Sequence, residues 1–600
     1  MATKEKRPTA IVIGAGVGGV STSARLAKAG FHVTVLEKNS FTGGRCSLLW
    51  SEDQKYRFDQ GPSLLLLPGL FKRAFEELGT SLEAEGVDLK KCEPNYKIHF
   101  GDGGRFELSS DLAVMKQQIE KWEGKGGFER YLAFLEESHR HYELSVQHVL
   151  LKNFTSLLSM LRVDFLRHLM DLHPFESIYS RASRYFWTER LRRVFTFGSM
   201  YMGMSPFDAP GTYSLLQYTE LAEGIWYPVG GFHRVVEAIE KIGRREGVEY
   251  RMNTGVKRIL LSEDSTKAVG VELENGEVLK ADVVVNNSDL VYAYSNLLPE
   301  SDYAASLTDR PGSCSSISFY WALDKKVHEL SAHNIFLADE YRESFDSIFK
   351  KHLIPDEPSF YVNVPSRIDS SAAPEGADSV VVLVPVGHLT SPDAKAKGGL
   401  PPTEEQDWPK MVSLARKTIL STIASRTGAD LSKHIIYERT NDPKIWKETF
   451  NLDKGAILGL SHSFFNVLCF RPSTRARRPG AYDSTLRHLG VLGRILEVVI
   501  DVLRGDMRDV KGLYMVGASA HPGTGVPIVL AGGALVAEQV CDDMGIPVPW
   551  RQAGDRKGWR MEVRSKLDQE EKPVLGWWTK RFLGFLLGAW FVWYVFGKRI

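Results

Sequence analysis

The hydrophobic pattern of the chain begins with Ala10–Ile13, four consecutive apolar residues of the kind that form a buried β-strand. A glycine-rich stretch, Gly14–Gly19, follows at once, and Ser21–Ala29 resembles a helix. Gly30 then ends the helix, and Phe31–Leu36 is a second apolar run. This order predicts a strand, a tight turn, a helix and a second strand, which is the opening unit of a parallel α/β sheet.

Two later segments continue the same pattern. After a turn at Tyr227–Gly231, we expect a helix over 232–242 and strands over 248–252, 256–260 and 281–285. Asn275-Gly276 separates two short apolar runs and predicts a tight hairpin. A last strand is expected from Gly512, followed by an apolar helix that ends near Met544. The fold class predicted from these elements is α/β.

The apolar pattern changes near the C-terminus. Fifteen consecutive residues, Phe582–Phe596, are apolar, and a lysine–arginine pair lies on each side of them. A helix over this run would cover roughly 22 Å, less than the roughly 30 Å of a bilayer core, although the flanking cations and tryptophans would extend its reach. We predict a C-terminal membrane segment over 579–600, joined by a charge-mixed linker over 546–578. The alternative is a helix buried on the protein's own surface.

Composition narrows the class of protein. The chain has 600 residues, too many for one hydrophobic core, so two or three domains are expected. Lysine and arginine number 75 against 74 acidic residues, so no excess of charge attracts nucleic acid. The five cysteines include no CxxC pair, which argues against a structural zinc or a disulfide framework and fits a reducing compartment. No secretory signal precedes the first strand, and no metal or hydrolytic motif is found.

The stretch Gly14–Gly19 has the GxGxxG spacing of a dinucleotide-binding turn. Gly14 permits the tight turn, Gly16 allows a pyrophosphate to approach the backbone, and Gly19 allows the helix to pack closely against the strand. The N-terminus of that helix faces the phosphates. Glu37, at the end of the second strand, is placed to accept hydrogen bonds from a ribose. The turn, its flanking strands and the acid together predict dinucleotide binding.

A second glycine pair indicates which dinucleotide is bound. Gly43-Gly44-Arg45 follows Glu37 and resembles the doublet of the flavin amine-oxidase and carotenoid-desaturase superfamily, where it lies against the pyrophosphate of FAD. Backbone without side chains, together with the Arg45 guanidinium, can reach phosphate oxygens. No second strand–GxGxxG–helix follows, so a separate NAD domain is not expected. The resemblance implies FAD as the bound cofactor, with the backbone of Val256 against its adenine.

The segment Gly517–Pro527, which reads GASAHPGTGVP, is predicted to form the loop against the flavin. Pro527 suits the first turn of the helix that follows. The N-terminus of that helix, with Gly525 and Val526, would stabilise an anionic reduced flavin. His521 is the candidate catalytic residue, as an acceptor or relay of a proton. The alternative is a histidine that orients the loop through its ring nitrogens.

Together these motifs resemble the phytoene desaturases of the bacterial and fungal type, over about Pro8 to Met544, with Tyr514–Pro527 the most specific part. Members of that family remove hydrogen from the C40 hydrocarbon phytoene in successive steps, with FAD as the redox group. The resemblance implies a lycopene-type product, with 3,4-didehydrolycopene left open. Two alternatives remain: another polyene-acting flavoprotein, such as a carotenoid isomerase or retinol saturase, and a non-catalytic prenyl-lipid chaperone of the same fold.

The resemblance also implies partners and a location. The expected partners are phytoene, later carotenoid intermediates, a lipid membrane, and a quinone or other external electron acceptor. No nucleic acid is expected, and a homo-oligomer is left open. The protein is expected to be membrane-associated, with its catalytic domain on the cytoplasmic side and the C-terminal apolar helix as its anchor.

The predicted architecture is a Rossmann-like FAD-binding domain of the flavin amine-oxidase and GDI-like type, interleaved with an α+β substrate domain. The first domain is assigned to 1–90, 225–300 and 510–545, and the substrate- and membrane-facing domain to 91–224 and 301–478. The segment 479–511 departs from the family pattern and is predicted to be an inserted amphipathic helix. Leu150–Leu169 has apolar residues at helical spacing and is either a membrane-entry helix or core packing.

Overall fold

The computed structural model describes residues 7–154, 168, 170–390, 406–463, 466–467, 471–480, 496 and 508–551. The predicted C-terminal segment 579–600 lies outside these residues, as do most of the predicted linker and most of the predicted insertion. The fold described below belongs to the unit Met1–Trp550.

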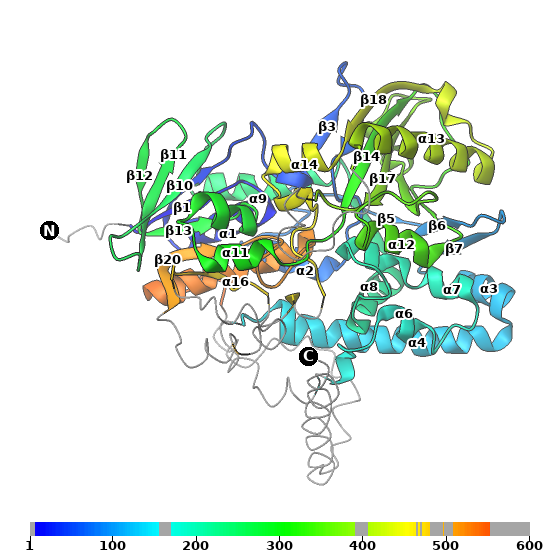
Figure 1. Ribbon diagram of the computed structural model, residues 1–600, viewed down its shortest axis with the longest axis horizontal. Helices are drawn as coiled ribbons and strands as arrows, with labels where there is room; N and C mark the ends of the chain where they lie inside the picture. Colours follow the sequence, from blue (N-terminus) through cyan, green and yellow to red (C-terminus); the bar gives the residue numbers. More distant parts are fainter. Residues whose placement is uncertain are drawn as a thin grey trace, which may run out of the picture. The chain divides into compact units, whose positions relative to one another are not determined.

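A six-stranded sheet carries the glycine-rich turn, and its strands come from distant parts of the chain (Figure 1). Its order is β19 (Arg475–Arg477), β20 (Asp509–Met515), β13 (Val283–Asn286), β1 (Thr9–Ile13), β2 (His32–Leu36) and β9 (Glu249–Arg251). All neighbours are parallel except β19 and β20, which pair antiparallel. The predicted parallel α/β sheet is confirmed.

The closing strand of this sheet is longer than the sequence predicts. β20 begins at Asp509 rather than at Gly512, because Asp509 pairs with Arg477 of β19. Just beyond this pair, the Arg478 N–H donates to the carbonyl oxygen of Arg508 at 2.7 Å. The last residues assigned to the insertion therefore belong to the sheet.

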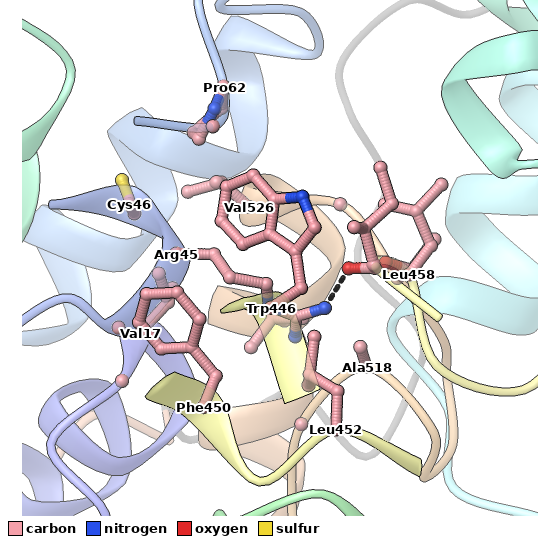
Figure 2. Close-up of a pocket in the computed structure, with 18 of the residues that line it drawn as sticks. Val17, Arg45, Cys46, Pro62, Trp446, Phe450, Leu452, Leu458, Ala518 and Val526 are labelled. Carbon is pink, nitrogen blue, oxygen red and sulfur yellow. Dashed lines mark hydrogen bonds between the residues drawn. The ribbon is translucent and has the colours of Figure 1, made fainter. Parts of the chain in front are cut away.

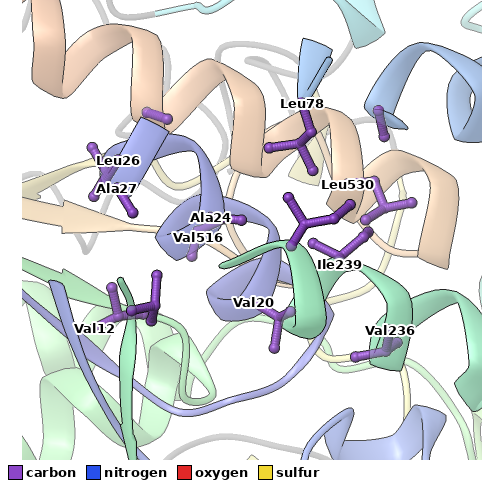
Figure 3. Packing of buried hydrophobic residues seen from close by; sticks show 14 of the residues in the cluster. Val12, Val20, Ala24, Leu26, Ala27, Leu78, Val236, Ile239, Val516 and Leu530 are labelled. Carbon is purple, nitrogen blue, oxygen red and sulfur yellow. The ribbon is translucent and has the colours of Figure 1, made fainter. Parts of the chain in front are cut away.

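One face of the sheet is covered by helices α1 (Val17–Lys28), α2 (Pro68–Glu77), α9 (His233–Arg245) and α16 (Val526–Met544). Successive residues of a strand point to opposite faces, so Val12 packs with this helical layer while Ile13 belongs to a second core. Figure 3 shows Val20 of α1 near Ile239 of α9 and Leu530 of α16. The helices predicted beside these strands are confirmed.

The second core lies between the six-stranded sheet and a small antiparallel sheet of β10 (Val256–Leu261), β11 (Ala268–Leu273) and β12 (Val278–Lys280). The turn between β11 and β12 is the predicted Asn275-Gly276 hairpin. Gly276 has a φ of +88°, a left-handed conformation that glycine adopts without strain. The hairpin prediction is confirmed.

A seven-stranded sheet forms the second large layer of the unit. Its order is β18 (Ile435–Asn441), β14 (Ser315–Leu323), β17 (Asp378–Val386), β16 (Phe360–Asn363), β15 (His333–Phe336), β6 (Tyr96–His99) and β7 (Arg105–Leu108). The pairs are antiparallel except for β15 and β6. The sheet joins strands from two separate stretches of the chain, so the two sheets are interleaved in sequence. The domain boundaries given above remain a prediction.

Helices cover this second sheet. The described ones include α3 (Leu112–Glu123), α4 (Lys125–Ser145), α12 (Tyr341–Phe349), α13 (Trp408–Thr427) and α14 (Pro443–Phe450). After α4 the chain continues as a π-helix, Val146–Leu150, and both Leu150 and Phe154 are buried against the protein. The start of the Leu150–Leu169 segment therefore packs in the core, and residues 155–167 and 169 lie outside the described residues. No helix among the described residues combines the length and apolar composition that crossing a bilayer requires.

Candidate functional site

A cavity of about 460 Å³ lies at the carboxyl ends of β1, β2 and β13 and continues to strands β14, β16 and β17 of the seven-stranded sheet. The carboxyl ends of parallel strands are where open α/β sheets bind their ligands. The cavity is lined by every predicted cofactor residue except Gly19: Gly14, Gly16, Glu37, Gly43, Gly44, Arg45, Val256, Gly517, Gly525, Val526 and Pro527.

The GxGxxG turn is closed by contacts within the protein. Gly14 has a φ of +91°, and a Cβ on Gly19 would lie 2.0 Å from the Gly14 carbonyl oxygen. Gly19 therefore allows the helix to pack closely against the turn, as predicted, although Gly19 itself does not line the cavity. A Cβ on Gly16 would lie 2.9 Å from Nδ2 of Asn287, whose amide donates to the Gly14 carbonyl at 3.2 Å. Asn287, directly after β13, thus crosses the turn, and sequence reasoning assigned it no role.

Glu37, which is predicted to accept hydrogen bonds from a ribose, follows the end of β2 and lines the cavity. Its Oε2 accepts the Ala15 N–H at 2.8 Å, and its Oε1 accepts both the backbone N–H and the side-chain amide of Asn39 at 2.9 Å. Each carboxylate oxygen can accept further hydrogen bonds. The acid therefore holds the glycine turn against the end of β2 and keeps acceptor capacity for a ribose hydroxyl.

The Gly43-Gly44-Arg45 doublet lies directly beside the turn. Gly43 forms a parallel bridge with Gly16, and its N–H donates to the Ala15 carbonyl at 2.8 Å. The Arg45 guanidinium donates to the Ile457 carbonyl oxygen, and Arg45 lines the cavity shown in Figure 2. Two short segments that are separate in sequence but adjacent in space thus bring backbone N–H groups and one cation to the same wall.

Asp289 supplies an acid close to that cation. Its carboxylate accepts the Tyr292 N–H at 3.0 Å and the Ser519 hydroxyl at 3.4 Å, and the residue lines the cavity. Burial raises the pKa of Asp289 to about 6, and the neighbouring Arg45 charge opposes that increase. Sequence reasoning missed this residue because Ser288-Asp289 carries no motif.

The loop Gly517–Pro527 is held from behind by two buried side chains. Arg471 donates to the carbonyl oxygens of Ala518 and Ala520, the second at 3.0 Å from its Nε. His462 Nε2 accepts the Thr524 N–H at 3.2 Å. Arg471 and His462 therefore hold the backbone of this loop through hydrogen bonds.

Helix α16 begins directly after this loop, with Gly525 as its N-cap and Pro527 in its first turn. Neither Gly525 nor Gly16, the N-cap of α1, gives the first turn a side-chain hydrogen bond, and neither first turn contains an acidic residue. Both helix N-termini therefore present N–H groups and partial positive charge to the cavity. That arrangement fits the phosphates and the reducible ring of a flavin dinucleotide.

His521 is not among the residues that line the cavity, although the loop that contains it does. Its Nε2–H donates to the Lys152 carbonyl oxygen at 2.7 Å, and its ring packs edge-on against Phe154 with centroids 5.1 Å apart. Burial lowers the pKa of His521 to about 4, so its imidazole is neutral at pH 7. This geometry favours the alternative in which His521 orients the loop.

The far half of the cavity is mostly apolar. Its apolar and aromatic lining residues from the second layer include Phe197, Met200, Tyr201, Met202, Leu216, Ile335, Leu337, Tyr341, Phe345, Phe360, Tyr361 and Leu383, and Ser315, Ser316 and Ser318 of β14 also line the cavity. Trp446 and Phe450 of α14 stack with ring centroids 5.8 Å apart, and both line the cavity (Figure 2). A long hydrophobic molecule could therefore lie along this half with one part beside the nucleotide-binding turn.

Comparisons with known proteins agree with this arrangement. A family model described as flavin containing amine oxidoreductase matches residues 17–403. Phytoene desaturase of Cercospora nicotianae is 71% identical over 99% of this chain and 99% of its own. Phytoene desaturase of Fusarium fujikuroi is 60% identical over 91% and 92%. A solved variant of putrescine oxidase, 12% identical, aligns with a TM-score of 0.53 over 89% of this chain and 99% of its own, a likeness of fold alone.

The fold and the site thus define a flavoprotein of the amine-oxidase type. The chain belongs to the flavin-containing amine oxidoreductase family and, within it, to the phytoene desaturases. The predicted family and the predicted cofactor, FAD, are confirmed.

Proposed function

We propose that this protein is an FAD-dependent oxidoreductase that introduces C=C bonds into phytoene in carotenoid biosynthesis. The observation that carries the proposal is the continuity of one cavity from the Gly14–Gly19 turn to the apolar half. A hydrocarbon has no polar group that a binding site can hold, so position must come from shape and apolar contact. Relatives that share up to 71% identity bear the same activity in their names.

The roles of the cofactor-binding residues follow from their places on the cavity wall. The N-termini of α1 and α16 and the Arg45 guanidinium offer positive charge to the diphosphate and to the reduced ring. Glu37 and Val256 both line the cavity. In this proposal Glu37 accepts a hydrogen bond from a ribose hydroxyl, and the backbone of Val256 covers the adenine. Bound FAD supplies the hydride acceptor, and the protein residues exclude water and fix the substrate beside it.

The apolar half selects the substrate by excluding water from its path. Leu216, Ile335 and Phe345 offer only carbon to the cavity, so this part of the wall would hold the hydrocarbon through apolar contact alone. Successive desaturation requires the hydrocarbon substrate to move along this half of the cavity between turnovers. The number of steps, and whether the product is lycopene or 3,4-didehydrolycopene, follows from how far that movement extends.

We further propose that the protein works at a membrane, since phytoene is a C40 hydrocarbon that partitions into lipid. The run Phe582–Phe596 supplies the anchor, with Lys598 and Arg599 at the headgroups and the catalytic unit on the cytoplasmic side. The electron acceptor is a membrane-borne quinone or a compound of similar potential. Burial of the apolar run contributes on the order of 25 cal/mol per Å².

Expression in a host that accumulates phytoene tests the proposal. We expect coloured products whose absorption moves stepwise to longer wavelength as double bonds are added. A host that retains unchanged phytoene, while the protein is present with bound flavin, would contradict the assignment. A product with an unchanged number of double bonds but altered geometry would indicate an isomerase.

A further inference from the structure

A buried acid lies behind the apolar half of the cavity. Glu220 is 2% exposed and belongs to a π-helical segment, Thr219–Glu223. Within the described part of the chain, no lysine, arginine or histidine forms an ion pair with it. An ionised carboxylate without a counter-charge is costly to bury, and short π-helical insertions are often found at functional sites.

The carboxylate is connected to the cavity by two tyrosines. The Tyr201 hydroxyl donates to the Tyr96 hydroxyl, and the Tyr96 hydroxyl donates to Oε1 of Glu220 at 3.3 Å. Tyr201 lines the cavity, Tyr96 is fully buried, and their rings stack with centroids 6.4 Å apart. The donors all point from the cavity toward the acid, which is the direction in which a proton would have to travel.

We propose that Tyr201, Tyr96 and Glu220 form a relay that removes the proton released during desaturation, with Glu220 as its final acceptor. The inference rests on the proposed function. One C–H bond of the substrate gives its hydride to the bound cofactor, and the neighbouring C–H bond gives a proton to the Tyr201 oxygen. The Tyr201 proton passes to Tyr96 and the Tyr96 proton to Glu220, while the electron pair of the second C–H bond becomes the new C=C bond.

The balance of electrons and protons is complete when an external quinone reoxidises the cofactor. The quinone takes two electrons and two protons, one that entered with the hydride and one that the substrate left on Glu220. Each turnover therefore removes the substrate's proton from Glu220 before the next desaturation.

The surroundings make Glu220 the group of this cluster that changes charge near neutral pH. Burial raises the pKa of Glu220 to about 8, although the hydrogen bonds from the two tyrosine hydroxyls act to lower it. The groups that face it are Tyr96 of β6 and Tyr201, with Tyr361 of β16 and His333 of β15 beyond them. Burial raises the pKa of each tyrosine well above its usual range and lowers that of His333 to about 3, so all four are uncharged at pH 7.

The relay predicts a rate that rises with pH, because the carboxylate must be ionised to accept a proton. Substrate-driven reduction of the flavin is measured without oxygen, in the full-length holoenzyme supplied with phytoene in phosphatidylcholine vesicles. The wild-type rate should increase about tenfold per pH unit below the pKa of Glu220 and level off above it. Glu220→Gln should slow the reduction about 100-fold and abolish this pH dependence. Tyr201→Phe, which keeps the ring but removes the hydroxyl, should also slow it.

Glu223→Gln is the matched control. Glu223 belongs to the same π-helical segment, but its carboxylate accepts from Tyr142 and Thr219 and does not contact the two relay tyrosines. Its variant should keep the wild-type rate and pH profile. Glu220→Asp, which restores a carboxylate, should recover part of the rate and a sloping profile, whereas a purely structural role would not restore that slope.

The outcomes separate this relay from the proposed function. Flavin content and the temperature of unfolding show whether each variant is folded. A folded Glu220→Gln or Tyr201→Phe holoenzyme that phytoene reduces at the wild-type rate, with the wild-type profile, overturns the relay and leaves the function intact. Wild-type flavin that phytoene does not reduce at any pH overturns the proposed function, and the relay with it.

Discussion

Nε of Arg471 donates to the carbonyl oxygen of Ala520 at 3.0 Å, and the same guanidinium donates to the carbonyls of Ala518, Ser461 and Asn466. Arg471 is 3% exposed, and among the described residues no carboxylate forms an ion pair with it. Burial lowers its pKa to about 10, so it remains protonated at pH 7. A positive charge is therefore fixed by carbonyl dipoles behind the flavin loop.

This arrangement predicts a large loss of stability in Arg471→Met. The substitution leaves several buried carbonyl groups without a donor, each at a cost of about 1–3 kcal/mol. We expect the free energy of unfolding, measured by urea denaturation, to fall by about 3 kcal/mol or more, with loss of bound flavin. Arg416→Met is the control, since Arg416 is 41% exposed in its pair with Glu438 and should lose less than about 1 kcal/mol. Equal stability of the two variants would contradict the role given to Arg471.

The glycine turn predicts that Gly16→Val abolishes flavin retention. A side chain at this position meets Nδ2 of Asn287 at 2.9 Å and occupies the space where a pyrophosphate approaches the backbone. The absorbance of the purified protein near the flavin bands measures the effect. Gly69→Val is the control, because a Cβ at Gly69 has no atom within 4 Å. A Gly16→Val protein with full flavin absorbance and activity would refute the assignment of this turn.

The Arg57–Asp369 ion pair predicts a loss of stability in acid. Both side chains are 4% exposed, and Asp369 also accepts the Gly230 N–H at 2.7 Å. Burial opposes ionisation of Asp369, but the hydrogen bonds from Gly230 and Ser371 and the charge of Arg57 lower its pKa to about 2. An unfolded aspartate titrates near 3.9, so this stabilisation is complete above that pH and is lost as the pH falls toward 2.

The magnitude can be measured by denaturant unfolding at two pH values. We expect the pair to contribute about 2 kcal/mol at pH 7, and Asp369→Asn to remove that part of the pH dependence while it lowers stability at neutral pH. Glu76→Gln is the control, because Glu76 is 48% exposed and its nearest cation, Lys72, lies 3.8 Å away. An Asp369→Asn protein whose stability falls in acid as steeply as the wild type would show that other carboxylates govern the effect.

The predicted anchor can be tested by truncation after Lys572. The run Phe582–Phe596 follows the described unit, so its removal should leave flavin binding unchanged while much of the protein moves from the membrane pellet to the soluble fraction. Turnover of membrane-borne phytoene should fall more than turnover of detergent-dispersed phytoene. Equal pelleting of the truncated and full-length proteins would mean that another surface makes the contact.

Local patterns in the sequence were sufficient to predict the nucleotide-binding half of the fold. Gly14, Gly16 and Glu37 lie within one strand–turn–helix–strand unit, whose glycines and apolar runs are recognisable without knowledge of the rest of the chain. The hairpin at Asn275-Gly276 was predicted for the same reason. The start of β20 was not, because its first residue is fixed by pairing with β19 rather than by its own composition.

The supporting side chains were missed because their contacts join distant segments. Asn287 contacts Gly14 across 273 residues, and Tyr96 contacts Glu220 across 124. In the sequence, Glu220 lies in a segment of mixed apolar and polar residues, and no feature distinguishes it from an acid on the surface. For His521, by contrast, position in the sequence suggested a role that the geometry does not favour. It is close in sequence to the cavity-lining glycines, but its ring is directed toward Lys152.

The proposed function requires phytoene to reach the bound flavin through this cavity and to reduce it. The most direct measurement is the absorption spectrum of the purified holoenzyme mixed with phytoene in the absence of oxygen and of any other acceptor. We predict that the oxidised flavin bands bleach while a polyene absorption appears at longer wavelength, in an amount that matches the flavin reduced. Flavin bands that stay unchanged, with phytoene recovered intact, would show that the protein does not desaturate phytoene through this flavin.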